Sequence, residues 1–249
     1  MAIVSILPEL ITSAGSKGVF GRAVEQGVVD LSVYDPRSYT TDRHRTVDDR
    51  PYGGGPGMVM MVEPVLAAIE GAKSVARTQG IQAPVIYLSP QGDRLDQQLI
   101  HDLAALPGMI LLCGRFEGVD ERVLDSAVDR QISIGDYVVT GGELPALVVM
   151  DAVSRLLPGT LGNAASAVEE SHLDGLLDYP HYTRPENTRD VGVPAVLTSG
   201  DHGAIRRWRL KQSLRRTWLT RPDLLATRPL SDLERELLRE LFESEAELK

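Results

Sequence analysis

The chain has 249 residues, of which 43% are hydrophobic and 24% charged, so it can form one large folded domain or two of ordinary size and is not disordered. No run of 18 apolar residues occurs and the N-terminal segment has no basic leader, so we expect neither a transmembrane helix nor a signal peptide. The single Cys113 excludes an intramolecular disulfide and is typical of a reducing compartment, which favours the cytoplasm.

The charge of the chain is unevenly distributed. A net charge of −9 disfavours nucleic acid as a partner if that charge is spread over the whole surface. However, residues 203–222 contain seven arginines and lysines and no acid, whereas residues 232–247 contain seven acids. We therefore expect an acidic C-terminal helix and a basic segment that stands apart from it.

In chain order, short apolar segments alternate with amphipathic ones over the first two-thirds of the sequence. The predicted strands are residues 3–7, 28–33, 85–89, 110–113 and 130–134. The predicted helices are a leucine-spaced segment over 95–106, a short helix over 119–128 and a longer, mostly buried helix over 144–157. This alternation predicts an α/β domain with a parallel sheet and helices on both faces.

The pattern changes after residue 158. Residues 159–200 are rich in Gly, Pro, Asn, Ser and Asp without a clear period, which indicates a functional loop or a linker. From about residue 201 the sequence is helical, with Leu210, Leu214 and Trp218 on one face. We expect an α/β domain over 1–160, a flexible linker and substrate loop over 161–200, and a small helical domain over 201–249.

Three polar, glycine-containing segments follow predicted strands, at residues 88–92, 114–118 and 134–143. Ligands of open parallel sheets bind where loops leave the carboxyl ends of the strands, so these segments predict one small-molecule site. A separate segment, 53–57, has four glycines and indicates either a tight loop or a close approach to a ligand. No Walker loop, dinucleotide fingerprint or zinc-ligand spacing is present.

Residues 169–185 form an irregular segment that supplies carboxylates, an arginine, hydroxyls and aromatic rings. Its composition is compatible with a solvated loop or with a lid that carries a catalytic carboxylate. Together with the block 42–55, the segment 181–186 and the basic region at Trp208 and Arg209, it resembles the bacterial tRNA (guanine-N1)-methyltransferases of the knotted SPOUT superfamily.

The resemblance implies a parallel α/β domain with a deep C-terminal trefoil knot, followed by the small helical domain. It also implies S-adenosylmethionine as the methyl donor, and a homodimer whose active site is shared between subunits. The implied substrate is the guanosine just 3′ of the anticodon in tRNA. The donor would be held by Tyr87, Leu88, Ser89, Pro90, Gly114, Phe116, Glu117, Ile134, Gly135, Asp136, Tyr137, Val138, Val139, Gly141, Gly142 and Pro145.

N1 of guanine carries a proton at neutral pH, so methylation needs a base for that proton and a cation near the neighbouring carbonyl oxygen. By resemblance the cation is Arg155 and the base is Glu170, with Asp178 as the second choice for the base. The family has Asp-Ser-Phe where this chain has Glu170, Ser171 and His172, so the carboxylate is kept but its reach differs.

We expect tRNA contacts from arginines and from polar groups of the irregular segment, with phosphates supplying affinity and an unstacked guanine supplying specificity. The expected substrate-binding residues are Arg43, His44, Arg45, Arg50, Asp178, Tyr182, Arg184, Arg207 and Arg215. The resemblance also implies dependence on magnesium, but no carboxylate cluster identifies a metal site.

Three other hypotheses stay open at this stage. A related knotted methyltransferase could act on ribosomal RNA or on a ribose oxygen. The chain could also be an RNA-binding protein that kept the fold and lost turnover, a hypothesis suggested by the change from aspartate to Glu170. A nucleotide-binding metabolic enzyme without an RNA partner is disfavoured by the basic segment.

Overall fold

A computed structural model describes the chain except residues 162–170, 172–174, 190 and 247–249. The chain divides into two compact units, Met1–Ala164 and Ala165–Lys249, each of which is described by itself. The predicted division at residues 160 and 200 stays a prediction.

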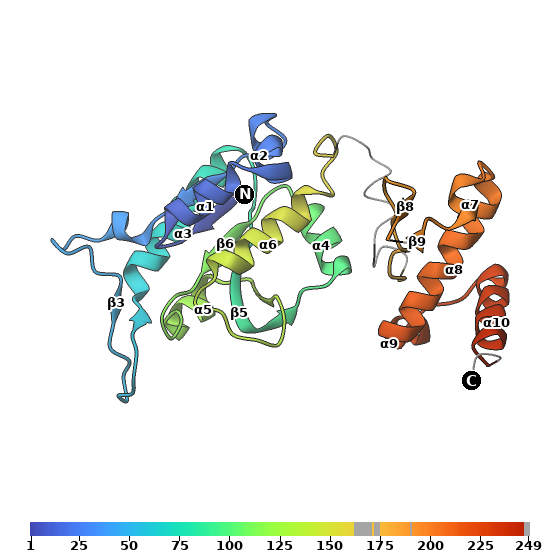
Figure 1. Cartoon of the computed structure of the whole chain (residues 1–249). Helices are drawn as coiled ribbons and strands as arrows, with labels where there is room; N and C mark the ends of the chain where they lie inside the picture. Colours follow the sequence, from blue (N-terminus) through green and yellow to red (C-terminus); the bar gives the residue numbers. More distant parts are fainter. Residues whose placement is uncertain (162–170, 172–174, 190, 247–249) are drawn as a thin grey trace. The chain divides into compact units, whose positions relative to one another are not determined.

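The first unit is built on a five-stranded sheet (Figure 1). Its strands lie in the order β2 (Ser32–Tyr34), β1 (Ala2–Val4), β6 (Ile110–Cys113), β5 (Val85–Arg94) and β7 (Arg130–Ser133), and all four pairings are parallel. The α/β class with a parallel sheet is therefore confirmed.

Two predicted strands have the wrong bounds. Residues 28–33 were predicted as a strand, but the amides of Val28 and Val29 both donate to the carbonyl of Ala23 and close the end of a helix, so β2 starts only at Ser32. The segment 88–92 was predicted as a loop after a strand ending at residue 89. Instead β5 continues to Arg94 and pairs again with β7 after an irregularity between Leu88 and Asp93.

Helices cover both faces of this sheet. The face reached by Ile3, Ile86 and Leu111 packs with α1 (Pro8–Gly15), α2 (Gly18–Glu25), α4 (Gln97–Ala104) and α6 (Glu143–Ser154). The opposite face, reached by Val4 and Leu112, packs with α3 (Val62–Thr78) and α5 (Glu121–Ala127). Neighbouring residues of one strand thus point to opposite apolar layers, as a sheet buried on both sides requires.

A long excursion leaves the sheet between β2 and α3. It contains a short 3-10 helix, η1 (Pro36–Tyr39), and a two-stranded hairpin of β3 (Asp48–Asp49) and β4 (Val59–Met60) that encloses the glycine-rich segment. Three of its glycines, Gly53, Gly54 and Gly55, have positive φ and no atom near the position of a Cβ. Their role here is to turn the chain, because only glycine adopts these angles without strain.

The second unit holds a small hairpin of β8 (Asn187–Thr188) and β9 (Val191–Gly192), and helices α7 (Ala195–Thr198), α8 (His202–Thr220), α9 (Pro222–Thr227) and α10 (Asp232–Ala246). Leu214 is fully buried and packs with Leu237 and Leu241 of α10. The rings of Trp218 and Phe242 meet edge to face with centroids 4.8 Å apart. The predicted apolar face of α8 is the face that contacts α10.

The basic segment does not stand apart from the acidic helix, and that prediction was wrong. The guanidinium of Arg207 donates to Glu236 at 2.8 Å and also to Glu240. The ammonium of Lys211 donates to the other oxygen of Glu240 at 2.8 Å. Because α8 and α10 pack through their leucines, their flanking charges meet and partly neutralise each other. Among the residues that the structure describes, no helix is long and apolar enough to cross a bilayer.

Candidate active site at the carboxyl edge of the sheet

A cavity of about 210 Å³ lies beyond the ends of β6 and β7 and beside residues 87–90 within β5. The three glycine-containing segments that the sequence singled out lie around it. Fifteen of the sixteen predicted cofactor residues line this cavity, and Asp136 alone does not. Arg115, Gly118, Ile132, Ser133 and Thr140 also line it and were not predicted.

Glycines allow these segments to approach one another closely. A Cβ on Gly114 would lie 2.7 Å from the hydroxyl of Tyr87, and a Cβ on Gly142 would lie 2.6 Å from the Cα of Cys113. Gly92 approaches the backbone of β7 in the same way, because its Cβ would be 2.3 Å from the amide of Ile132. Side chains at these positions would push the loops apart, so the shape of the cavity depends on their absence.

The segment 114–118 is a tight turn with an unusual backbone. Phe116 has a φ of +60°, which is uncommon for a bulky residue, and its side chain is 49% exposed. The turn is held by the amide of Glu117, which donates to Met58 at 2.9 Å, and by the amide of Gly118, which donates to Arg115 at 3.0 Å. The conformation therefore aims an aromatic ring outward at the rim of the cavity.

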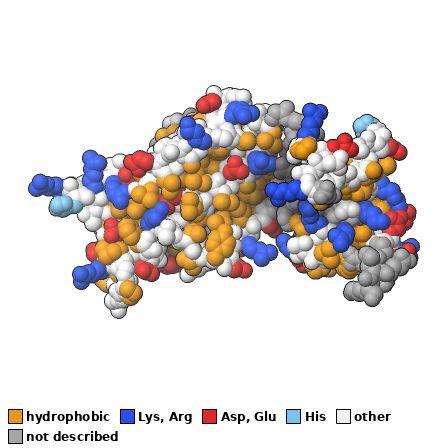
Figure 2. Space-filling model, in the orientation of Figure 1, with side chains coloured by type: hydrophobic (Ala, Val, Ile, Leu, Met, Phe, Trp, Pro, Cys, Tyr) orange, Lys and Arg blue, Asp and Glu red, His pale blue; other side chains and the backbone are white. Residues whose placement is uncertain are grey.

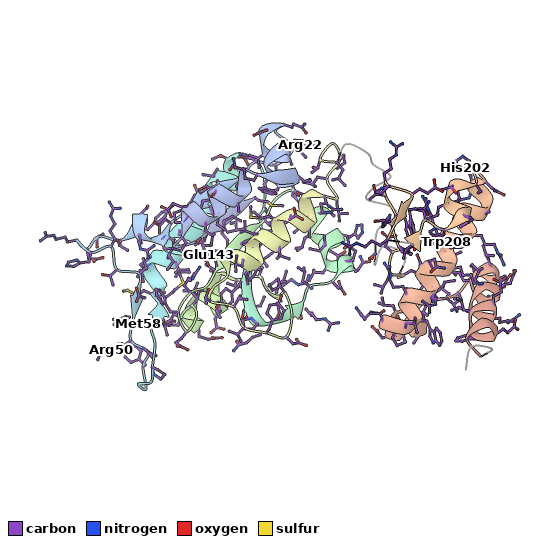
Figure 3. All side chains as sticks on the ribbon, viewed as in Figure 1. Arg22, Arg50, Met58, Glu143, His202 and Trp208 are labelled. Atoms are coloured by element: carbon purple, nitrogen blue, oxygen red, sulfur yellow. The ribbon has the colours of Figure 1, made fainter. Side chains whose placement is uncertain are left out.

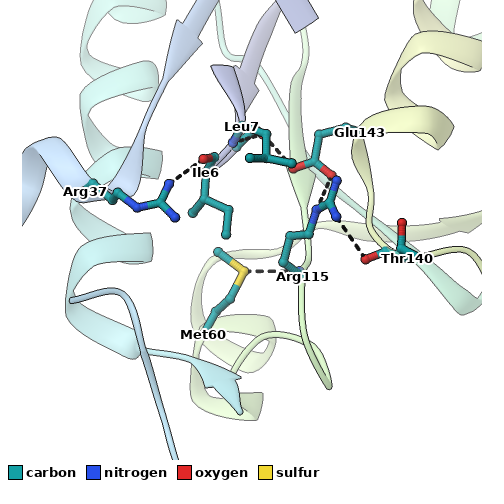
Figure 4. Close-up of polar contacts among 8 residues, drawn as sticks. Ile6, Leu7, Arg37, Met60, Arg115, Thr140 and Glu143 are labelled. Atoms are coloured by element: carbon teal, nitrogen blue, oxygen red, sulfur yellow. Dashed lines mark hydrogen bonds and ion pairs between the residues drawn. The ribbon is translucent and has the colours of Figure 1, made fainter. Parts of the chain in front are cut away.

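A buried carboxylate lies next to the cavity (Figures 3 and 4). Glu143, the first residue of α6, is 0% exposed. One of its oxygens accepts from the hydroxyl of Ser5 at 2.7 Å, and the other accepts from Nε of Arg115 at 2.8 Å. A second guanidinium nitrogen of Arg115 donates to the carbonyl of Thr140 at 3.3 Å. This network was not predicted from the sequence, although an acid in the first turn of an apolar helix indicates a partnered carboxylate.

Two weakly acidic groups near the cavity stay protonated around neutral pH. Burial raises the pKa of the Cys113 thiol well above its ordinary value, and the nearby carboxylate of Glu143 raises it further. Burial also raises the pKa of Tyr87. A raised pKa disfavours the thiolate form of Cys113 at neutral pH.

Arg155, the predicted catalytic cation, lies at the other end of α6. Gly142 and Pro145 line the cavity at the start of this 12-residue helix, whereas Arg155 is its C-cap. A rise of 1.5 Å per residue separates the two ends by about 18 Å. The neighbouring Val153 and Leu157 line a different cavity, of about 310 Å³, beside Met1 at the amino edge of the sheet. In one copy of the chain, Arg155 and the carboxyl-edge cavity are far apart.

The predicted base, Glu170, lies outside the described residues, as do Glu169, His172 and Asp174. Asp178, the second choice, accepts a 2.8 Å hydrogen bond from the ring of His181 if that nitrogen is protonated. The amide of Asp178 donates to the hydroxyl of Ser171 at 2.9 Å.

A large groove of about 1050 Å³ is present in the second unit. Tyr182 and Arg184, both predicted to bind substrate, line it together with Tyr179, His181 and Arg209, which were not predicted. The guanidinium of Arg209 lies 4.8 Å from the centre of the Tyr179 ring, and the Tyr179 and His181 rings are 4.7 Å apart. Aromatic rings beside arginines are a common surface for unstacked bases and phosphates.

The predicted basic residues of the excursion are all exposed. Arg43, His44 and Arg45 follow Asp42, whose carboxylate accepts from the amides of His44 and Thr46 and from the Thr46 hydroxyl. Arg50 lies on the hairpin, near Met58 (Figure 3). In Figure 2, basic side chains and a histidine gather at the left end of the first unit in this view. The excursion between β2 and α3 is therefore a projection that presents positive charge away from the sheet.

Comparison with known proteins decides the family. A model of the family described as tRNA (Guanine-1)-methyltransferase TrmD matches residues 1–227. The chain belongs to this family. It is 60% identical over 247 residues to the tRNA (guanine-N(1)-)-methyltransferase of Methylococcus capsulatus, covering 99% of this chain and 97% of that protein. It is 57% identical over 249 residues to the protein of the same description from Serratia proteamaculans, covering 100% and 96%.

Membership of this family confirms the resemblance that the sequence indicated. It makes S-adenosylmethionine the ligand to test in the carboxyl-edge cavity, and it disfavours a related methyltransferase with another RNA target. No group of three or more metal-binding side chains occurs in the described part of the chain, so a magnesium site has no assigned residues. Of the predicted substrate residues on α8, Arg207 pairs with two acids of α10. Arg215 is exposed and also has an interaction of its own.

Proposed function

We propose that this chain is the enzyme that methylates N1 of the guanosine just 3′ of the anticodon in tRNA, with S-adenosylmethionine as donor. The observation that carries the proposal is the carboxyl-edge cavity, lined by fifteen of the sixteen residues that the family resemblance implied for the donor. The near full-length identity to tRNA (guanine-N(1)-)-methyltransferases supports the same conclusion. We expect the enzyme to work in the cytoplasm.

The residues around the cavity fit an adenosyl group. Close-packed glycines expose backbone amides and carbonyls, which can pair with the edge of adenine and with ribose hydroxyls. Tyr137, Val138 and Val139 add exposed apolar surface at the rim. The bound donor supplies a methyl group that is already electrophilic, so the protein needs to orient it and exclude water, with no further activation.

The acceptor needs more help from the chain. Glu170 removes the N1 proton of guanine, and Arg155 stabilises the negative charge that grows on the adjacent carbonyl oxygen. Glutamate has nearly the same ordinary pKa as the family's aspartate, so the longer side chain changes reach and angle more than basicity. Phe116, at the rim, offers a ring on which the extruded base can stack.

The site is completed by a second copy of the chain. Arg155 lies about 18 Å along α6 from the cavity of its own copy, which is too far for a side chain to bridge. In a homodimer, Arg155 of one copy can reach the cavity of the other. A deep trefoil knot formed by the carboxyl-edge loops is part of the same proposal, and it accounts for loops from separate stretches closing around one ligand.

The tRNA contacts fall into two groups. The exposed side chains Arg43, His44, Arg45 and Arg50 bind phosphates, which adds affinity and salt dependence without sequence preference. The groove at Tyr182 and Arg184 contacts unpaired nucleotides. Arg207 and Arg215 of α8 add phosphate contacts outside this groove. The dependence on magnesium that the resemblance implies is tested by titration with a chelator.

The decisive experiment incubates the purified chain with S-adenosylmethionine and unmodified tRNA transcript, and then maps the modified nucleoside by mass spectrometry. N1-methylguanosine 3′ of the anticodon supports the proposal. A methyl group elsewhere favours a related knotted methyltransferase with another RNA target. Binding without methyl transfer in a single turnover would mean that the fold has lost its activity.

The base is tested by Glu170→Ala and Glu170→Asp. The alanine variant should lose most turnover and keep donor affinity, because the carboxylate acts on the acceptor, whereas the aspartate variant restores the family residue and should retain activity. Turnover of Glu170→Ala near that of the unmodified enzyme would exclude Glu170 as base, and Asp178→Asn would then be the next variant to measure.

A further inference from the structure

We propose that Arg115 and Glu143 form a positioning clamp that sets the distance between two of the loops that hold the donor. The clamp is not assigned by the family resemblance, and it deepens the proposed function of the carboxyl-edge cavity. Neither residue is proposed to touch the reacting atoms.

The clamp starts from a carboxylate with no access to water. Glu143 is 0% exposed and both of its oxygens have partners, the hydroxyl of Ser5 at 2.7 Å and Nε of Arg115 at 2.8 Å. Ser5 directly follows β1, and Glu143 opens α6 directly after Gly142. The carboxylate therefore ties the end of β1 to the end of the loop 134–142.

Arg115 carries the connection to the second loop. Its side chain is 20% exposed and reaches from the turn 114–118 to Glu143 and to the carbonyl of Thr140, at 2.8 and 3.3 Å (Figure 4). Its backbone forms a bridge with Gly141, and the amide of Gly142 donates to Gly114 at 2.8 Å. Two nitrogens of the planar guanidinium thus hold the turn 114–118 against Thr140 and Glu143 at the end of the loop that follows β7.

The path of this arginine also explains one glycine. A Cβ on Gly141 would lie 2.3 Å from Nε of Arg115, so the side chain passes directly over this backbone. The loop 134–142 is therefore shaped around the clamp, and both Gly141 and Thr140 line the cavity. Substitution of Arg115 or Glu143 should therefore change the width of the cavity.

Stability alone is a poor reason for such a pair. Replacing a buried ion pair by apolar side chains of similar volume is often neutral or stabilising, whereas removal of one partner leaves a costly buried charge. We infer that the pair of Arg115 and Glu143 acts on geometry, because its hydrogen bonds fix the turn 114–118 and the loop 134–142 in one arrangement. This difference between stability and geometry gives a test that separates the two roles.

The test is the double variant Arg115→Met with Glu143→Leu, which removes the ion pair without leaving a charge. The double variant leaves the buried Ser5 hydroxyl without its acceptor, which costs about 1–3 kcal/mol, so we expect the unfolding temperature to fall by several degrees while the enzyme stays folded. Calorimetric affinity for S-adenosylhomocysteine should fall at least tenfold, and the single-turnover rate of methyl transfer should fall about 100-fold, the loss associated with about 1 Å of misplacement. Arg122→Met is the matched control, because the pair of Arg122 with Asp120 is exposed near the same edge.

Glu143→Gln is the second variant, in case the double variant does not fold. The amide keeps the shape and can still accept from Ser5, but it loses the charge that holds Arg115, so affinity should again fall while the control variant binds normally. Affinity within twofold of the unmodified enzyme in either folded variant overturns the clamp. If the unmodified enzyme itself fails to bind S-adenosylhomocysteine or to methylate tRNA, the proposed function fails and not the clamp alone.

Discussion

Gly142→Ala tests whether the cavity depends on close packing of two backbones. Gly142 has a φ of −74° and a ψ of −9°, angles that alanine adopts freely, so the only new feature is a methyl group. That Cβ would lie 2.6 Å from the Cα of Cys113 and 3.0 Å from the amide of Gly114, whereas ordinary contact begins at 3.4 Å. The loop must retreat by about 0.8 Å from the end of β6.

The size of the effect follows from this retreat. Overpacking of this kind costs about 1–3 kcal/mol, against which alanine gains up to about 1 kcal/mol by restricting the unfolded chain. A net cost of about 1–2 kcal/mol should lower the unfolding temperature by about 2–8 °C. The single-turnover rate of methyl transfer should fall about 10- to 100-fold, because the displaced backbone lines the cavity.

Gly108→Ala is the matched control for this prediction. It precedes β6 at the opposite edge of the sheet. The nearest atom to its Cβ would be a methyl carbon of Ile81 at 3.1 Å, and the next atoms are side-chain carbons at 3.9 and 4.0 Å. Its rate should equal that of the unmodified enzyme. Both variants are compared by thermal unfolding, calorimetric binding of S-adenosylhomocysteine and single turnover on tRNA. If Gly142→Ala binds and transfers normally, the backbone contact does not set the width of the cavity.

Three further predictions concern other parts of the molecule. Arg155→Ala should lower the single-turnover rate about 100- to 1000-fold with donor affinity unchanged, and a normal rate would remove it from the mechanism. Arg43→Gln should reduce the slope of log affinity for tRNA against log salt by about 0.7–0.9, because its side chain is exposed, and Arg207→Gln should reduce it by less because two acids already bind Arg207; equal slopes would contradict this. The hydrogen bond from Lys211 lowers the pKa of Glu240, so its stabilisation is present above the ordinary range of glutamate and lost as pH falls through the lowered value. Glu240→Gln should therefore have a lower unfolding temperature than the unmodified chain at neutral pH, and an equal one in acid. A difference in unfolding temperature that does not depend on pH would contradict this.

Apolar runs and helical spacing predicted the sheet because these strands are buried on both faces. Ile110–Cys113 is apolar throughout, and the structure has a strand with those bounds. The strand predicted over 28–33 was wrong at its start, because the amides of the adjacent Val28 and Val29 close the end of a helix. The hydrophobicity of these residues does not indicate that role. Helix α3 was missed although Val65, Ala68, Ile69 and Ala72 recur at helical spacing.

The lining of the cavity was predictable through resemblance, and its supporting network was not. Glycines after strands are visible in sequence, whereas the pairing of Arg115 with Glu143 joins residues 28 positions apart through tertiary packing. Charge was misjudged for the same reason. A basic helix and an acidic helix read as separate surfaces in sequence, but the apolar contact of Leu214 with Leu237 brings their charges together.

This neutralisation bears on how a chain of net charge −9 binds an anionic substrate. Arg207 and Lys211 are held by Glu236 and Glu240, so α8 presents less positive charge than its composition indicates. The excursion before β3 differs, because Asp42 is the one acid in the sequence 36–47 and its carboxylate accepts from local amides and a hydroxyl. Arginines there keep their charge exposed. Electrostatic attraction for tRNA phosphates should therefore be strongest at this projection, and the C-terminal unit should contribute more through its aromatic groove.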